Sequence, residues 1–222
     1  MDRLPQRHGT QGIALSDHLH VCVFYRDEDE RYRTLRTFFE EGFRRNDKNV
    51  HVVDPRKRSS HRCRLRALGL DVGAAEKSGQ LEILGWDEAH LRPGWFDQHS
   101  MVGFVEEMLR AFTDQGFPFA RLVGDMGWAR KDVRGVRDLV EYCARLNGLL
   151  PRFQASVICT YDLRQFSALQ VVEVLRSHPV AVIGGVVHEN PYYTPAEETL
   201  QEIARRQQRE PPRVEDSGHV AH

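Results

Sequence analysis

The chain alternates short apolar runs with longer amphipathic stretches. The short runs predict six strands, over residues 19–25, 50–53, 80–84, 120–123, 155–160 and 180–187. Apolar residues at helical spacing predict helices over residues 31–42, 60–68, 101–115, 133–150 and 168–176. Strands that are apolar on both faces and alternate with helices are typical of a parallel sheet covered on both sides. The pattern therefore predicts an α/β domain of three layers with a mostly parallel central sheet.

The polar ends of the chain fall outside this pattern. A length of 222 residues fits a single α/β domain with tails. Residues 1–17 are predicted to be a flexible N-terminal segment, and residues 18–204 the domain itself. Residues 205–222 are polar and contain two consecutive prolines, which predicts a disordered tail.

The exit of the first strand is the place where an α/β protein would carry a phosphate-binding loop. Here the chain has no G-x-x-x-x-G-K-[ST] or G-x-G-x-x-G motif, and no glycine lies between Gly12 and Gly42. Residues 27–30 are instead four consecutive acidic residues. Four carboxylates would repel a triphosphate, although they suit the N-terminus of a helix. ATP hydrolysis is not expected, and Gly42 is predicted to cap the C-terminus of the first helix.

Charge and cysteine content narrow the partners and the compartment. The formal net charge of −1 gives no general attraction to nucleic acid or to an anionic membrane, so neither direct DNA binding nor membrane association is expected. A basic stretch begins at residues 56–58 and continues on the next helix, where alternate arginines indicate a solvated face. The four cysteines are widely spaced and form no C-x-x-C pair, which is typical of reduced thiols in a cytoplasmic protein.

Polar and aromatic residues gather at the predicted carboxyl ends of the strands, where parallel sheets bind ligands. They are Tyr25, Asp125, Trp128, Tyr161 and Asp162. The aromatic rings would form the walls of a ligand pocket, and the carboxylates would orient a donor on the ligand or pair with Arg121. The alternative interpretation is that these are ordinary strand-end residues of a packed sheet.

Imidazole and thiol groups form a second candidate set. His20, Cys22, Cys159 and His178 could converge if the first and fifth strands are close, and such ligands would suit zinc or iron. Cys159 and His178 could equally form the thiolate pair of an enzyme. Buried histidine and cysteine are more often simply packed, and no local ligand pair is present. No metal and no catalytic residue is therefore predicted from this set.

Short motifs along the chain resemble the MEDS domain, the sensory domain of methanogen/methylotroph DcmR-type regulators. The motifs are HVCVFY (20–25), FFEEG (38–42), GQL (79–81), GWFD (94–97), GF (116–117) with Arg121, GDMGW (124–128), EY (141–142) with Asn147, CTYD (159–162), HP (178–179) and NPY (190–192). The resemblance implies a RecA/KaiC-like fold without a working P-loop. It also implies a sensory role in transcription control with a small organic ligand.

Together these features favour a cytoplasmic signal-sensing module that binds a small organic or nucleotide-like ligand and controls transcription through a separate regulatory protein. An enzyme is the competing hypothesis, either a degenerate nucleotide-binding enzyme or a thiol-dependent one that uses Cys159. A zinc or iron sensor is a further alternative. The sequence does not identify a cofactor.

Overall fold

Seven strands form one sheet in the computed structural model, which describes residues 20–130 and 132–209. Their order across the sheet is β3-β2-β4-β5-β1-β6-β7, and β7 alone runs antiparallel to its neighbour. The bounds are β1 (His20–Tyr25), β2 (Lys48–Val53), β3 (Leu81–Gly85), β4 (Ala120–Asp125), β5 (Ala155–Asp162), β6 (Val180–Ile183) and β7 (Val186–Glu189).

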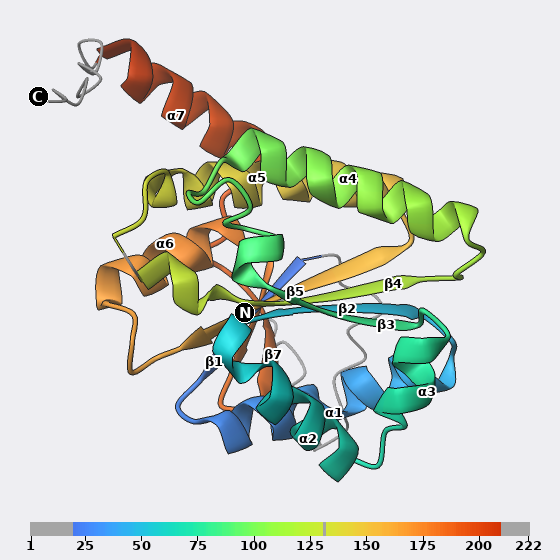
Figure 1. Ribbon diagram of the computed structural model, residues 1–222. Coiled ribbons are helices and arrows are strands. Elements are labelled where there is room, and N and C mark those ends of the chain that lie inside the picture. Colours follow the sequence, from blue (N-terminus) through green and yellow to red (C-terminus); the bar gives the residue numbers. More distant parts are fainter. Residues whose placement is uncertain (1–19, 131, 210–222) are drawn as a thin grey trace, which may run out of the picture.

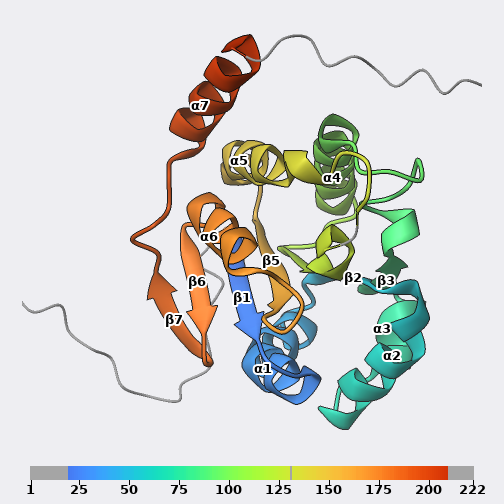
Figure 2. The same cartoon turned by 90° about the vertical axis from the view of Figure 1, so that its left-hand side faces the viewer.

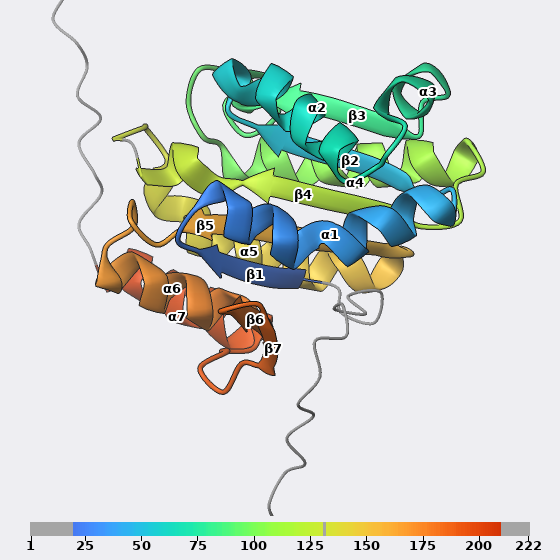
Figure 3. The ribbon, with the colours of Figure 1, turned by 90° about the horizontal axis from the view of Figure 1, so that it is seen from below.

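Helices cover both faces of this sheet. They are α1 (Glu28–Arg44), α2 (Arg58–Ala67), α3 (Val72–Lys77), α4 (Gln98–Asp114), α5 (Leu139–Leu149), α6 (Ala168–Ser177) and α7 (Ala196–Arg209). Helices α4, α5 and α6 lie above the sheet in Figure 1, and α1, α2 and α3 lie below it. Figure 3 shows α1 running along the lower face beside β1 and β4. The predicted three-layer α/β fold is confirmed.

Alternation along the strands separates the core into two apolar clusters, one on each face of the sheet. In β1, Val21 and Val23 belong to the cluster shared with α1, α2 and α3, whereas Cys22 and Phe24 belong to the cluster shared with α4, α5 and α6. Side chains of a strand point alternately to opposite faces, so a strand buried on both sides must be apolar at nearly every position.

The acidic turn after β1 acts as a helix cap. Only Arg26 and Asp27 separate β1 from α1, and the Asp27 side chain accepts a 2.8 Å hydrogen bond from the backbone N–H of Glu30. Asp29 pairs with Arg64, and Glu28 pairs with Lys57, both across to the basic segment that leads into α2. These carboxylates have local partners that need no ligand.

The predicted single strand over residues 180–187 is wrong. The chain forms a hairpin there, with Gly184 and Gly185 at the turn between β6 and β7 (Figure 2). Their φ angles are 59° and 77°, which a two-residue hairpin turn needs and which favour glycine. The apolar run concealed the turn because the residues on both sides of the two glycines are apolar.

Several predicted element bounds also differ. The prediction missed α3 and α7, and α7 continues to Arg209, so the predicted boundary at residue 204 falls inside a helix. The helix predicted from residue 133 begins as α5 only at Leu139, after Gly135 at a φ of 84°. The predicted segment 1–17 and the tail beyond residue 209 lie outside the described residues. No helix among the described residues is long and apolar enough to cross a membrane.

Gly42 does not cap α1, which continues to Arg44. A Cβ atom at Gly42 would lie 2.5 Å from Asn49 Oδ1 and 2.7 Å from Arg121 Cδ. Gly42 is therefore a point of close approach between α1 and the side chains of β2 and β4.

Substitution of Gly42 tests this packing. Gly42→Ala is expected to lower the free energy of unfolding by about 1–3 kcal/mol, because two buried polar side chains must shift. Gly103→Ala is the matched control within α4, where nothing lies within 4 Å of the new Cβ. It is expected to stabilise the protein by up to about 1 kcal/mol. Urea unfolding of both variants gives the comparison, and equal effects would contradict the close approach.

Candidate functional site

A buried ion pair closes the carboxyl edge of the sheet where β1 and β4 end. Arg31, from the first turns of α1, places its guanidinium Nη1 3.4 Å from Asp125 Oδ2 and lies over the ring of Tyr25 at 5.6 Å. All three residues are buried. Asp125 Oδ1 also accepts a 2.9 Å hydrogen bond from the backbone N–H of Gly127. Arg31 and this turn thus supply hydrogen-bond partners for both oxygens of Asp125.

Asp162, at the end of β5, is held in its own turn. Its carboxylate accepts hydrogen bonds from the backbone and guanidinium of Arg164 and from the amide of Gln165. The predicted alternative partner of these carboxylates, Arg121, lies at the opposite edge of the sheet. Arg121 is fully buried there and pairs with Asp47 at 2.7 Å and Glu41 at 3.2 Å. The predicted pairing of Arg121 with the pocket carboxylates is therefore wrong.

Trp128 is an internal packing residue. Its indole ring has no exposed surface and stacks on the imidazole of His90 at 5.1 Å, with the ring of Phe96 4.7 Å away on another side. Trp128, in the loop after β4, therefore packs against His90 and Phe96 of the loop after β3.

Tyr161 alone of the five predicted ligand-binding residues lines a described cavity. The cavity has a volume of about 160 Å³ and lies between the end of β5, α6 and the segment leading into α5. Its lining residues are Ala129, Val136, Arg137, Leu139, Val140, Tyr161, Phe166, Gln170, Glu173, Val174 and Ser177. The Tyr161 hydroxyl is buried near the Cys159 thiol, and no partner among residues 20–130 and 132–209 lies within hydrogen-bonding distance of it.

The structure therefore divides the predicted pocket. Tyr25 and Asp125 belong to the ion-paired edge, Asp162 to a turn and Trp128 to the core, whereas Tyr161 faces the cavity. The sequence analysis missed Arg31 and Phe166, because one arginine among several in a charged helix and one aromatic residue in a loop carry no distinguishing signal.

The predicted imidazole and thiol residues do converge in part. His20 and His178 lie with ring centroids 4.1 Å apart, and Cys159 Sγ lies 3.5 Å from His20 Nε2. Cys22 instead hydrogen-bonds the carbonyl oxygen of Val180. The third residue near the two histidines is Cys143 of α5, which the sequence analysis did not single out. A cysteine on the apolar face of a helix gives no signal that separates a ligand from a core residue.

The basic stretch before and within α2 is largely neutralised. Arg56 pairs with Asp54, Lys57 with Glu28, Arg58 with Glu88, Arg62 with Glu76 and Arg64 with Asp29. Such pairing leaves little free positive charge for phosphates, in agreement with the predicted solvated face. The absence of direct DNA binding stays a prediction.

The architecture and its relatives define the class of protein. A KaiC-like protein of Pyrococcus horikoshii aligns with a TM-score of 0.51 and 16% identity, over 73% of this chain and 69% of that one. The fold is therefore KaiC-like. Residues 19–179 match the family model of the MEDS domain, the MEthanogen/methylotroph, DcmR Sensory domain. The chain belongs to this family of sensory domains, as the resemblance implied, and so has a signal-sensing role.

A relative of known regulatory role matches over most of the chain. The transcriptional repressor DcmR of Methylorubrum extorquens is 29% identical over 169 residues, which cover 75% of this chain and 60% of the repressor. The match thus spans well under the full length of that relative.

The Arg31–Asp125 pair is expected to be a strong determinant of stability. Arg31→Met leaves a buried carboxylate without its counter-charge and should lower the free energy of unfolding by about 3–5 kcal/mol. The double variant Arg31→Met/Asp125→Asn should recover much of this loss, because asparagine still accepts the hydrogen bond from Gly127. Arg36→Met, on the same helix, removes an exposed pair with Glu40 and should cost below about 1 kcal/mol. Equal losses for Arg31→Met and Arg36→Met in urea unfolding would refute this role.

The histidine beneath Trp128 should make stability depend on pH. Burial lowers the pKa of His90 to about 4, from 6.5 in the unfolded chain. The unfolded state therefore takes up a proton first as the pH falls. The stabilisation from neutral His90 is complete above pH 6.5 and declines toward pH 4, by about 2 kcal/mol between pH 7 and pH 5. Unfolding measured at both pH values should show a smaller loss for His90→Phe than for wild type. The exposed His99→Phe should behave as wild type, and an unchanged loss in His90→Phe would contradict the assignment.

Proposed function

We propose that the chain is a cytoplasmic sensory module that binds a small, mostly apolar organic molecule in the cavity beside Tyr161 and controls transcription through a separate protein. The cavity is the observation that carries this proposal. It lies at the carboxyl end of β5, in a domain whose family is sensory.

The size of the cavity limits the ligand. A volume of about 160 Å³ is close to that of apolar protein cavities that hold benzene, at roughly 150 Å³. The ligand therefore has about six non-hydrogen atoms. Ligands of this size gain at most about 1.5 kcal/mol per atom, about 9 kcal/mol in all, so the tightest possible Kd is a few tenths of a micromolar. A nucleotide is far too large for this space.

The lining indicates how such a ligand would be held. Phe166, Val174 and Leu139 supply apolar and aromatic contact, while Tyr161 contributes a buried hydroxyl without a partner among the described residues. A ligand with one polar atom could accept or donate a hydrogen bond there, which would repay the cost of an unsatisfied buried hydroxyl. Gln170 and Glu173 supply further polar groups from α6.

Helix α7 offers a route from the cavity to a partner. It packs against α5 and projects beyond the body of the domain (Figure 1 and Figure 2). Arg176 of α6 pairs with Glu202 of α7 at 2.8 Å, and the carbonyl of Arg176 accepts a hydrogen bond from the Thr194 backbone at 2.9 Å. A ligand between α5 and α6 would act on both helices that seat α7. The repressor relative supports transcription as the process that receives the signal.

The thiol-dependent enzyme is less well supported. Burial raises the pKa of Cys159 well above its usual range, so the residue is a thiol at neutral pH and a poor nucleophile. Its neighbour is His20 rather than the predicted His178, and both are buried. The Arg31 guanidinium beside Asp125 likewise supports a domain without nucleotide hydrolysis, since it lies at the strand ends where a nucleotide would bind.

Benzene is a direct probe of the cavity. At a concentration one hundred times its Kd, it should raise the free energy of unfolding of the wild type by about 2.7 kcal/mol. Val174→Phe places a ring in the cavity and should abolish this increase. Val172→Phe is the matched control, because Val172 lies on the same helix but is exposed and does not line the cavity.

The proposal fails if benzene and a panel of similarly small alcohols and halogenated hydrocarbons leave the unfolding of the wild type unchanged. It also fails if Val174→Phe and Val172→Phe respond alike while both are folded by circular dichroism.

A further inference from the structure

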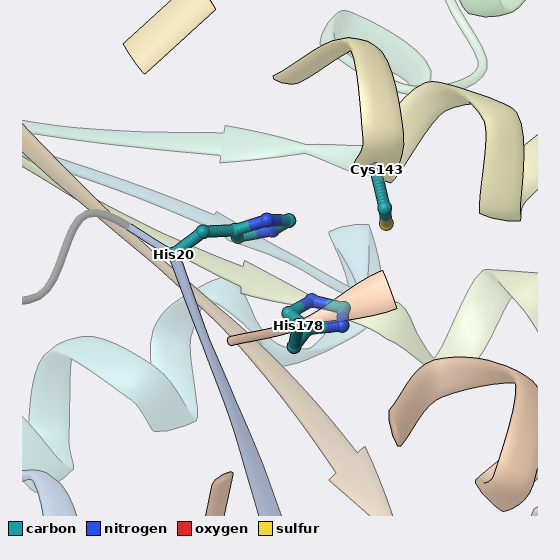
Figure 4. Close-up of side chains that lie close together, drawn as sticks. All are labelled: His20, Cys143 and His178. Carbon is teal, nitrogen blue, oxygen red and sulfur yellow. The ribbon is translucent and has the colours of Figure 1, made fainter. Parts of the chain in front are cut away.

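A second group of buried side chains lies next to Tyr161, whose ring centroid is 6.1 Å from that of His178. His20 begins β1, His178 follows α6, and Cys143 projects from α5 toward them (Figure 4). One imidazole nitrogen from each histidine and Cys143 Sγ all lie within 4.8 Å of one another, and all three residues are buried. Three segments far apart in the sequence thus bring two imidazoles and a thiol to one point.

The hydrogen bonds fix which nitrogen of each ring is available. His178 Nδ1 lies 2.8 Å from the carbonyl oxygen of Val174, which can only accept, so Nδ1 carries the proton. His178 Nε2 then bears a lone pair, and it is buried without a hydrogen-bond partner among the described residues. A buried acceptor with no hydrogen-bond partner is rare in proteins, and a bound ion is one explanation for it.

His20 is held in the same way. Its Nδ1 lies 2.8 Å from Asn147 Oδ1, and the Asn147 amide donates to the carbonyl of Ser177 at 2.9 Å, which fixes Oδ1 as the acceptor. The lone pair of His20 is therefore also on Nε2. Histidines that bind metals commonly donate the other ring N–H to a carbonyl oxygen, which sets both tautomer and orientation. Both histidines show this arrangement.

We propose that His20 Nε2, His178 Nε2, Cys143 Sγ and Cys159 Sγ form a binding site for a zinc-like divalent metal ion. In a tetrahedral zinc site with two nitrogen and two sulfur ligands, the ligand atoms lie about 3.3–3.8 Å apart. Cys159 Sγ is already 3.5 Å from His20 Nε2. The ligand atoms of His20, His178 and Cys143 need to close by on the order of 1 Å. Cys159 Sγ is not within 4.8 Å of all three, so it completes the shell through a larger side-chain rotation.

The charge of this ligand set suits its surroundings. Two thiolates neutralise a divalent ion, and two neutral imidazoles complete the shell, so the site carries no net charge inside an apolar cluster. Binding releases one proton from Cys143 and one from Cys159 to solvent, while the Nδ1 protons stay in place. This inference goes beyond ligand binding in the cavity and does not depend on it.

Cobalt provides the test, because Co²⁺ takes zinc sites and its spectrum reports both geometry and thiolate ligation. The full chain is stripped of metal with a chelator and titrated with CoCl₂ under reducing conditions. Saturation at one ion per chain is expected, with a thiolate charge-transfer band in the near ultraviolet, intense tetrahedral d–d bands in the visible, and loss of these bands on addition of ZnCl₂. Metal analysis of the untreated protein should find the same stoichiometry.

Variants identify the ligands. Cys143→Ser and His178→Gln should lose the tetrahedral spectrum and weaken cobalt binding at least tenfold. Cys22→Ser, a buried cysteine on the same strand as His20 that is not among the proposed ligands, and Cys63→Ser, an exposed cysteine of α2, should leave both unchanged. If the ligand variants fail to fold, the wild-type stoichiometry and spectrum still decide the matter. A wild type that gives no thiolate band at saturating CoCl₂, or a spectrum lost in Cys63→Ser, would overturn the proposal.

Discussion

The buried ion pair between Arg31 and Asp125 closes the carboxyl ends of β1 and β4. Both side chains are almost completely out of solvent, so each needs the other, since a lone buried charge costs several kcal/mol. The pair joins the first turns of α1 to the end of β4 and fills the carboxyl edge of the sheet between them. The acidic cap of α1 at Asp27 adds a negative charge at the same place. The proposed ligand site is instead the space beside Tyr161, on the face covered by α5 and α6.

Many of the short motifs that tie the chain to its family are structural. Gly42 allows α1 to approach Asn49, and Arg121 uses that space to reach Asp47 and Glu41 at the edge opposite the ion pair. Asn190 caps the segment after α6 by donating to two carbonyl oxygens. These residues make packing contacts, ion pairs and hydrogen bonds within the fold. They explain why the motifs identify the family well and the ligand poorly.

The sequence predicted the fold well because alternation and burial act at every position of a strand. A parallel sheet covered on both faces follows from apolar strands between amphipathic helices, and the structure has this arrangement. The hairpin at Gly184 was missed because the apolar residues of β6 and of the start of β7 merge into one run. Helix α7 was missed because its residues are mostly polar, and its packing on α5 depends on tertiary contacts.

The site was harder to predict. Tyr161 was singled out because the strand-end rule is topological and needs no knowledge of side-chain contacts, and its place beside the cavity agrees with that rule. Asp125 and Trp128 satisfied the same rule, yet their roles depend on Arg31 and His90, which come from distant parts of the chain. Cys143 carries no signal in its own helix and becomes notable only beside His20 and His178. Convergence of this kind is set by tertiary packing and cannot be deduced from local pattern.

The central proposal is that a ligand binds in the cavity beside Tyr161, while the Arg31–Asp125 pair closes the ends of β1 and β4. Crystals of the protein pressurised with xenon test this directly, because xenon enters apolar cavities without a chemical preference. The account predicts a xenon peak in contact with Tyr161, Phe166 and Val174, and Arg31 still paired with Asp125. A cavity without xenon, or xenon at the ends of β1 and β4 with the Arg31 guanidinium displaced, would contradict it.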